Sequence, residues 1–258
     1  MKLHGVLTSQ TDPVSGHARP YVMEDALSRS LHFASYETQS RMWLSDPTGL
    51  ALDYTQTMMG FLLFQPQPAH IAMIGLGGGS LAKFCHHHLA DARIEVVEIN
   101  PHVIALRDQF LVPADDERLS IREGDGADFI RGFHAQLDVV LVDGYDRNGI
   151  NSRVCSQAFY DDCRESLRPG GLISVNLSAA HSYYDTFIER IEHSFGKQHL
   201  VVRDFEKRND IVFAWIGEVP LEALCGDGRP AEIPADTWTA LTAAMSRVRR
   251  AWKLRPRG

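Results

Sequence analysis

A glycine loop between two apolar runs constrains this chain more than any other feature. Residues 71–100 read IAMIGLGGGSLAKFCHHHLADARIEVVEIN, and the second apolar run ends on Glu98. Gly75, Gly77 and Gly79 allow a tight backbone turn and admit a ligand where a Cβ atom would clash. Glu98 closes the second run with a carboxylate that suits a ribose diol. The segment therefore predicts a strand, a nucleotide-binding loop, a helix and a second strand.

The spacing of the glycines indicates which nucleotide is bound. A dinucleotide fingerprint reads G-x-G-x-x-G, but the sixth position here is Ser80. A pyrophosphate also needs free N–H groups at a helix N-terminus. A GxGxG loop followed by an acidic strand end resembles the class I S-adenosylmethionine fold, whose ligand carries a sulfonium cation and no phosphate. The loop therefore favours an adenine nucleoside that bears a positive charge.

From residue 71 onward, apolar runs of strand length alternate with segments of helix length. This rhythm predicts an α/β fold with a doubly wound, mostly parallel, seven-stranded sheet. A short polar segment, 206–210, separates the last two strands, so that edge of the sheet is expected to be antiparallel. The predicted strands are 71–75, 94–99, 119–122, 137–142, 171–177, 199–204 and 210–216. The predicted helices are 79–90, 101–110, 126–132, 156–167, which ends sharply at the turn 168–171, and 182–195.

The remaining segments divide the chain into three parts. Residues 1–66 are predicted to form a small N-terminal β meander and a lead-in helix over 53–64. Residues 67–218 are predicted to form a Rossmann-like, nucleoside-binding catalytic domain. Residues 219–258 form a loop, a helix over 236–250 and a basic tail. With 258 residues and 44% hydrophobic content, the chain is long enough to bury one full core.

Composition limits the location and the partners of the protein. No apolar stretch approaches the roughly 20 residues of a membrane helix, and the N-terminus lacks the features of a signal peptide, so a soluble cytoplasmic protein is expected. The four cysteines lack CxxC spacing, which favours reduced thiols. The net charge is −7, although the last dozen residues are basic. Such an acidic body disfavours nucleic acid and favours cationic ligands, while the basic tail is expected to be a frayed or oligomer-contacting end.

Acidic side chains follow the predicted strands, at the edge where an open α/β sheet binds ligands. Glu98, Asp125, Asp143 and Asp146 are therefore expected to place four carboxylates around one crevice. Asp143 directly follows the apolar run LDVVLV. An ammonium substrate must lose a proton before its nitrogen attacks, and a carboxylate can hold the cation and accept that proton. Because aspartate is a poor base for an alkylamine, most of the rate acceleration is expected from in-line alignment of the reacting atoms.

The motifs GDG at 124–126 and DxxD at 143–146, with FY and LRPGG downstream, resemble the spermidine synthase family of aminopropyltransferases. The resemblance spans roughly residues 56–177. It implies decarboxylated S-adenosylmethionine as co-substrate, with attack by a small-molecule amine, release of methylthioadenosine and a homodimer or larger homo-oligomer. No metal is expected, and intact S-adenosylmethionine is the co-substrate if the protein is a methyltransferase. Glu98 would hold the ribose, Asp125 the adenine amino group and Asp146 an amine. The implied site comprises Asp143 and Asp146 as catalytic residues, Gln56, Gly75, Gly77, Gly79, Glu98, Asp125 and Gly126 as nucleoside contacts, and Tyr145 as a substrate contact.

Three departures from the family indicate a divergent branch. Gly78 stands where the family has an aspartate that grips the amine of the donor's aminopropyl arm. Thr55 replaces the aromatic residue before the glutamine of the family's YQEM stretch. The stretch RDFEKRNDIVFAW lacks the family's P-x-Y-P-x-G pattern. Contacts to the donor tail and to the acceptor are therefore expected to differ from those of the family.

Other interpretations of these residues stay open. Asp125 suits a helix N-cap as well as a ligand contact, Asp146 suits a turn, and Tyr160 suits the core. The triplet 86–88 of histidines is expected on a helix surface, because consecutive helical side chains point about 100° apart and cannot converge on one metal ion. Two other functions remain, a methyltransferase that uses S-adenosylmethionine and a noncatalytic nucleoside-binding protein that interacts through its basic tail. Asp143 disfavours the noncatalytic alternative.

Overall fold

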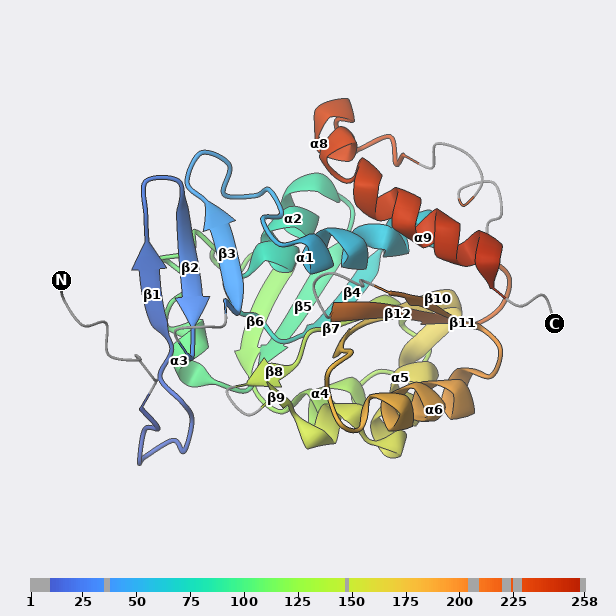
Figure 1. The fold of residues 1–258 in the computed structure, drawn as a ribbon, viewed down its shortest axis with the longest axis horizontal. Helices are drawn as coiled ribbons and strands as arrows, with labels where there is room; N and C mark the ends of the chain where they lie inside the picture. Colours follow the sequence, from blue (N-terminus) through green and yellow to red (C-terminus); the bar gives the residue numbers. More distant parts are fainter. Residues whose placement is uncertain are drawn as a thin grey trace.

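A seven-stranded sheet runs through the middle of this computed structural model (Figure 1). The structure describes residues 10–34, 38–146, 149–203, 209–219, 224 and 229–255. The strands of the sheet are β4 (His70–Ile74), β5 (Arg93–Glu98), β6 (Leu119–Glu123), β7 (Leu137–Val142), β10 (Leu167–Ser178), β11 (His199–Val202) and β12 (Asn209–Trp215). Their spatial order is β11-β12-β10-β7-β4-β5-β6; β12 runs antiparallel to both of its neighbours, and all other pairs are parallel. The predicted α/β fold with a mostly parallel sheet and one antiparallel edge is confirmed.

Helices cover both faces of the sheet (Figure 1). One face carries α1 (Asp53–Met58), α2 (Ser80–His88) and α9 (Thr242–Leu254), and the other carries α4 (Gly126–Ile130), α5 (Gln157–Ser166) and α6 (Tyr184–Phe195). Alternate residues of each central strand enter the two hydrophobic clusters, so that Val139 packs on one side of β7 and Val140 on the other. Because both faces are covered, β7 reads in the sequence as a continuous apolar run.

A separate three-stranded antiparallel sheet precedes the central one. It consists of β1 (Tyr21–Glu24), β2 (Ser28–His32) and β3 (Ser40–Trp43), which confirms the predicted N-terminal meander. Leu31 and Met42 are buried in the same hydrophobic cluster as the central sheet. Ser80, at the start of α2, donates a hydrogen bond to the backbone carbonyl of Arg41. The small sheet therefore lies against the glycine loop.

The ends of several elements differ from the sequence prediction. The predicted helix 101–110 is only α3 (Pro101–Ile104), followed by turns in which Leu111 has φ 54°. The predicted helix 53–64 continues past α1 as the 3₁₀ helix Met59–Leu63. The predicted helix 156–167 ends sharply at Ser166, as expected, but residues 168–171 belong to β10, whose pairing with β7 changes register between Leu167 and Leu172. Most of the predicted connection 206–210 lies outside the described residues.

The C-terminal helix also differs from the prediction. The expected helix 236–250 is divided into α8 (Ala235–Ala240) and α9. Val248 and Trp252 of α9 are buried against the sheet, and the Arg255 guanidinium stacks over the Trp252 ring. The expectation of a frayed end is therefore wrong for the residues up to Arg255. The basic residues between Arg247 and Lys253 lie on α9 together with apolar side chains that pack on the core.

Asp138, at the start of β7, joins three segments and is 3% exposed. Its Oδ2 accepts hydrogen bonds from the backbone N–H groups of Ala69 (2.6 Å) and His70 (2.8 Å), and its Oδ1 accepts one from Gln65 and pairs with Arg168. We expect Asp138→Ala to lower the free energy of unfolding by about 3 kcal/mol, since two buried amides lose their acceptor. Urea unfolding measures this loss. Asp138→Asn keeps one acceptor oxygen and should lose less; equal losses would contradict the assignment.

Lys83 on α2 is a buried cation, 2% exposed, whose Nζ donates a 2.8 Å hydrogen bond to the backbone carbonyl of Phe110. Burial lowers the pKa of this amine to about 8. Between that pH and the ordinary lysine pKa of about 10.4, the unfolded chain holds a proton that the folded protein has released, so stability rises with pH across this window. Urea unfolding between pH 7 and 10 should show this rise in the wild type but not in Lys83→Met. Parallel stability profiles for the two proteins would contradict it.

Candidate active site

The glycine loop joins β4 to α2 through three residues in left-handed conformations. The φ angles are 93° at Gly75, 52° at Gly77 and 68° at Gly79. A Cβ atom on Gly75 would lie 2.3 Å from the backbone carbonyl oxygen of Asp143, so this glycine lets the ends of β4 and β7 approach each other. The close approach brings the loop directly beside Asp143.

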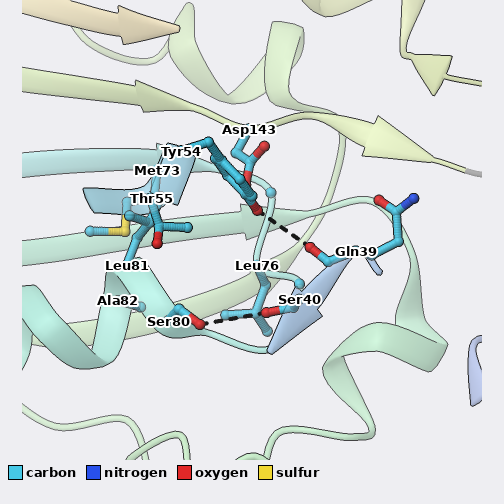
Figure 2. Close-up of a pocket in the computed structure, with 12 residues that line it drawn as sticks. Gln39, Ser40, Tyr54, Thr55, Met73, Leu76, Ser80, Leu81, Ala82 and Asp143 are labelled. Carbon is cyan, nitrogen blue, oxygen red and sulfur yellow. Dashed lines mark hydrogen bonds between the residues drawn. The ribbon is translucent and has the colours of Figure 1, made fainter. Parts of the chain in front are cut away.

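A pocket lies over this loop, between the N-terminal sheet and α1 (Figure 2). Its lining includes Gly75, Leu76 and Gly77 of the loop together with residues of the N-terminal part of the chain. The sequence prediction treated that part as an appendage, but it supplies much of the pocket. The polar lining consists of Gln39, Ser40, Tyr54, Thr55, Ser80 and Asp143.

The Asp143 carboxylate is half-buried and is held by hydrogen bonds to both of its oxygens. The Tyr54 hydroxyl donates to Oδ2 at 3.0 Å, and the Asn176 amide donates to Oδ1 at 2.8 Å. Asn209 in turn donates to the side-chain oxygen of Asn176 at 2.9 Å. Burial raises the pKa of Asp143, and the hydrogen bonds from Asn176 and Tyr54 oppose that rise. The carboxylate is therefore fixed in orientation before any ligand binds.

Two tyrosines lie near this carboxylate. Burial and the neighbouring charge of Asp143 raise the pKa of Tyr54 well above its usual value, so its phenol stays protonated and remains a donor. Burial also raises the pKa of Tyr145, whose hydroxyl accepts a hydrogen bond from the backbone N–H of Ser178 at 2.5 Å. Tyr54 is a site residue that was not predicted from the sequence. The available signal was its position: Tyr54 is an aromatic residue directly before Thr55, and Thr55 stands where the family pattern has its aromatic residue.

Glu98 ends β5 and is buried beneath the loop, 8% exposed. Its Oε2 accepts a hydrogen bond from the backbone N–H of Leu76, and its Oε1 accepts one from that of Asn100, both at 2.8 Å. Burial raises the pKa of Glu98, and the backbone hydrogen bonds oppose this change. The backbone N–H groups of Gly77 and Ile99 also face this carboxylate, so the loop and the end of β5 hold it in place.

Asp125 is the N-cap of α4, so this alternative from the sequence is confirmed. Its Oδ1 accepts a 2.8 Å hydrogen bond from the backbone N–H of Ala127, and its Oδ2 lies 2.9 Å from the Arg153 guanidinium. Gly126 opens the helix, where a Cβ atom would lie 2.4 Å from Ile74. The N-terminus of α4 is thereby drawn close to the end of β4.

The strand ends form one continuous rim. The backbone N–H of Gly124 donates to the Glu98 carbonyl at 3.0 Å, and that of Asp143 donates to the Ile74 carbonyl at 2.9 Å. Glu98, Asp125 and Asp143 consequently lie along neighbouring strand ends, beside the glycine loop, rather than scattered over the molecule.

Some expected site residues lie elsewhere or lack a described side chain. The Gln56 amide donates to the backbone carbonyl of Leu50 at 2.9 Å, whereas Tyr54 and Thr55 are the α1 residues that line the pocket. Asp146 belongs to the short strand β8 (Tyr145–Asp146), and its side chain lies outside the described part of the chain.

The histidine triplet only partly matches its predicted surface location. His86 pairs with Asp116 at 2.8 Å, but His88 is buried and packs against the Phe84 ring, so the surface prediction is wrong for His88. Within the described ranges, no three His, Cys, Asp or Glu residues are grouped to hold a metal ion. No helix of those ranges has the length and apolar character to span a membrane.

Comparison with known proteins gives consistent findings. The family model of the spermine/spermidine synthase domain matches residues 52–202. A polyamine aminopropyltransferase of Chromobacterium violaceum is 42% identical over 175 residues, which cover 67% of this chain and 67% of that protein. A probable spermidine synthase from Corynebacterium glutamicum aligns with a TM-score of 0.67 and 17% identity, over 83% of this chain and 81% of that one. Human methyltransferase-like protein 13 in complex with SAH aligns with a TM-score of 0.58 and 22% identity, over 81% of this chain and 95% of that one. At these identities the two structures show the fold alone.

Proposed function

Since this chain belongs to the spermine/spermidine synthase family, we propose that it transfers an aminopropyl group from decarboxylated S-adenosylmethionine to a small-molecule amine. The observation that carries the proposal is the Asp143 carboxylate, which lines the pocket over the glycine loop and is held by Tyr54 and Asn176. An ammonium group entering this pocket meets an anion whose direction is already set.

The reaction needs alignment and one proton acceptor. The nitrogen lone pair of the amine attacks the carbon beside the sulfonium sulfur, the new N–C bond forms, and the C–S bond breaks with its electron pair moving to sulfur. Methylthioadenosine leaves as a neutral thioether, and Asp143 accepts the proton released by the amine. Because a carboxylate is a weak base for an alkylamine, its main contribution is to hold nitrogen, carbon and sulfur in line.

The donor is proposed to lie along the rim of strand ends, with its positive charge among carboxylates. Glu98 would accept from the ribose hydroxyls, Asp125 would accept from the adenine amino group, and the glycines would admit the nucleoside. Gln56 would contact the nucleoside through its amide oxygen or its second N–H, while the first N–H donates to the Leu50 carbonyl. Asp146 is proposed to hold the acceptor amine, and Tyr145 to contact the substrate.

Calorimetry and product analysis test this function. Purified protein is titrated with decarboxylated S-adenosylmethionine, S-adenosylmethionine and methylthioadenosine, and products formed with putrescine are identified by mass. Preference for the decarboxylated donor with release of methylthioadenosine supports the proposal. Formation of S-adenosylhomocysteine would replace it with methyl transfer, and binding without any product would leave the noncatalytic alternative.

One observation keeps methyl transfer as a second candidate. A Cβ atom on Gly78 would lie 2.7 Å from the Ser40 hydroxyl and 2.9 Å from the Phe110 ring. The position at which the family grips the aminopropyl amine therefore has no carboxylate and no space for one. The shared fold with a methyltransferase adds no more than fold-level support.

The oligomeric state and the cellular location stay predictions from the sequence. We propose a homodimer or larger homo-oligomer in the cytoplasm, with an amine as partner molecule and no nucleic acid. Light scattering after size-exclusion chromatography tests the oligomeric state, and fractionation of cells tests the location.

A further inference from the structure

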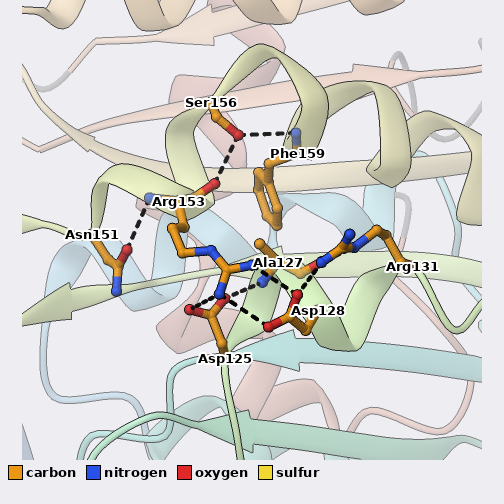
Figure 3. Close-up of polar contacts among 8 residues, drawn as sticks. All are labelled: Asp125, Ala127, Asp128, Arg131, Asn151, Arg153, Ser156 and Phe159. Atoms are coloured by element: carbon orange, nitrogen blue, oxygen red, sulfur yellow. Dashed lines mark hydrogen bonds and ion pairs between the residues drawn. The ribbon is translucent and has the colours of Figure 1, made fainter.

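Arg153 lies in the 3₁₀ helix η2 (Ser152–Cys155), and its guanidinium reaches two carboxylates of α4 (Figure 3). Nη1 is 2.9 Å from Asp125 Oδ2, and Nη2 donates a 2.7 Å hydrogen bond to Asp128 Oδ1. Nη1 also donates to Asp128 Oδ2 at 3.0 Å. A single planar guanidinium thus connects the N-cap of α4 with a residue of its first turn, which a lysine point charge could not do in the same way.

The backbone beneath Arg153 is held in place from both sides. The Asn151 side chain accepts a hydrogen bond from the N–H of Arg153 at 2.9 Å, and the Ser156 hydroxyl donates to its carbonyl at 2.9 Å. Val154 is buried so closely against Gly126 that a Cβ there would lie 3.1 Å from its side chain. The guanidinium therefore extends from a base that is fixed relative to the start of α4.

The contacts of Asp125 leave this carboxylate little freedom. Its side chain is 16% exposed, one oxygen accepts from Ala127 and the other faces Arg153. Each oxygen retains a lone pair for a further donor. The exocyclic amino group of adenine is such a donor, whereas the carbonyl oxygen of hypoxanthine at the same position would be repelled.

We propose that Arg153 is a positioning residue that holds the Asp125 carboxylate in the direction that distinguishes a 6-amino purine from a 6-oxo purine. The inference rests on the proposed function, which takes Asp125 as the adenine contact. The role of Arg153 is to orient Asp125 without touching the ligand. Removing the guanidinium leaves Asp125 in place as an N-cap but frees its outer oxygen to turn toward solvent.

Arg131 provides a matched control. It pairs with the same Asp128 and donates to the Ala127 carbonyl, and none of its described contacts is with Asp125 (Figure 3). Arg131→Gln removes the same charge beside the same Asp128, from the C-terminal end of α4. Both arginines are about half exposed, so changes in overall stability should be small and similar.

Calorimetry with methylthioadenosine and with its inosine analogue tests the proposal. Arg153→Gln should weaken methylthioadenosine binding about fivefold, the size expected for an exposed ion pair, and leave the inosine analogue unchanged. Arg131→Gln should leave both affinities unchanged, and Arg153→Lys should fall between the wild type and Arg153→Gln. Loss of a merely structural role would weaken the binding of both ligands together. The difference between the two changes in affinity is therefore the decisive measurement.

The outcomes separate this inference from the proposed function. If Arg153→Gln weakens the binding of both ligands equally, or weakens the binding of neither, the proposed role of Arg153 is overturned. If Asp125→Asn no longer distinguishes methylthioadenosine from its inosine analogue while Arg153→Gln still does, only the inference about Arg153 fails. If the wild-type protein binds no methylthioadenosine, the proposed function itself fails.

Discussion

Asp143→Asn is expected to lower kcat by about 10² to 10⁴-fold, the range that a positioned proton acceptor contributes. The asparagine keeps the shape of the side chain and its place after β7, but it can neither attract an ammonium group nor accept its proton. The hydrogen bonds from Tyr54 and Asn176 already restrict the carboxylate. The loss should therefore appear in turnover rather than in the binding of the nucleoside.

Steady-state kinetics with putrescine and calorimetry with methylthioadenosine measure these two effects separately. The dissociation constant of methylthioadenosine should change by less than about threefold, since Asp143 is proposed to act on the amine in the transition state and not on the nucleoside. A variant with full kcat, or with nucleoside binding lost in proportion to kcat, would contradict the catalytic assignment of Asp143.

Tyr54→Phe is the accompanying control, because it removes the hydrogen bonds from the Tyr54 hydroxyl to Asp143 and to the Gln39 carbonyl and leaves the carboxylate. Burial raises the pKa of Asp143, and the Tyr54 hydroxyl opposes that rise. Activity that requires the ionised carboxylate is lost as the pH falls through this pKa. The acid limb of the pH–rate profile should therefore move to higher pH in Tyr54→Phe and be absent in Asp143→Asn. An acid limb unchanged in both variants would assign it to another group.

The strands and the acidic strand ends could be predicted from the sequence because local patterns determine them. A parallel strand covered by helices on both faces reads as a continuous apolar run, and the edge of the sheet at which its carboxyl end lies follows from the alternation of strands and helices. Glu98 and Asp143 were located in this way, since each stands at the end of such a run. The helix ends were less accurate, as at Ile104, because tertiary packing decides where the last turn closes.

The partners of the site residues could not be predicted, since they depend on contacts between distant segments. Tyr54 reaches Asp143 across 89 positions of the sequence, and Arg153 reaches Asp125 only because η2 packs over α4. Asn176 carried a visible signal that the sequence analysis did not use. It is an amide in the apolar strand LISVNLS and is 3% exposed, and a buried polar side chain requires a partner.

Gly75→Ala is expected to have the second large effect, on stability and on activity together. The residue has φ 93°, which costs an L-residue about 1–2 kcal/mol. The added Cβ would also lie 2.3 Å from the backbone oxygen of Asp143, and overpacking of this kind costs about 1–3 kcal/mol more. Urea unfolding should therefore show a total loss of about 2–5 kcal/mol.

Gly170→Ala separates the two causes, because Gly170 has a similar φ of 84° with no atom within 4 Å of the added Cβ. This control should lose only the conformational part, about 1–2 kcal/mol, and keep its kcat. In Gly75→Ala the backbone at Asp143 must move to relieve the collision, so kcat should fall at least tenfold even at temperatures where the variant is folded, since small displacements of a catalytic group are costly. Equal stability and equal kcat in the two variants would show that β4 and β7 separate freely at this point, and that the direction of Asp143 does not depend on the absence of a side chain on Gly75.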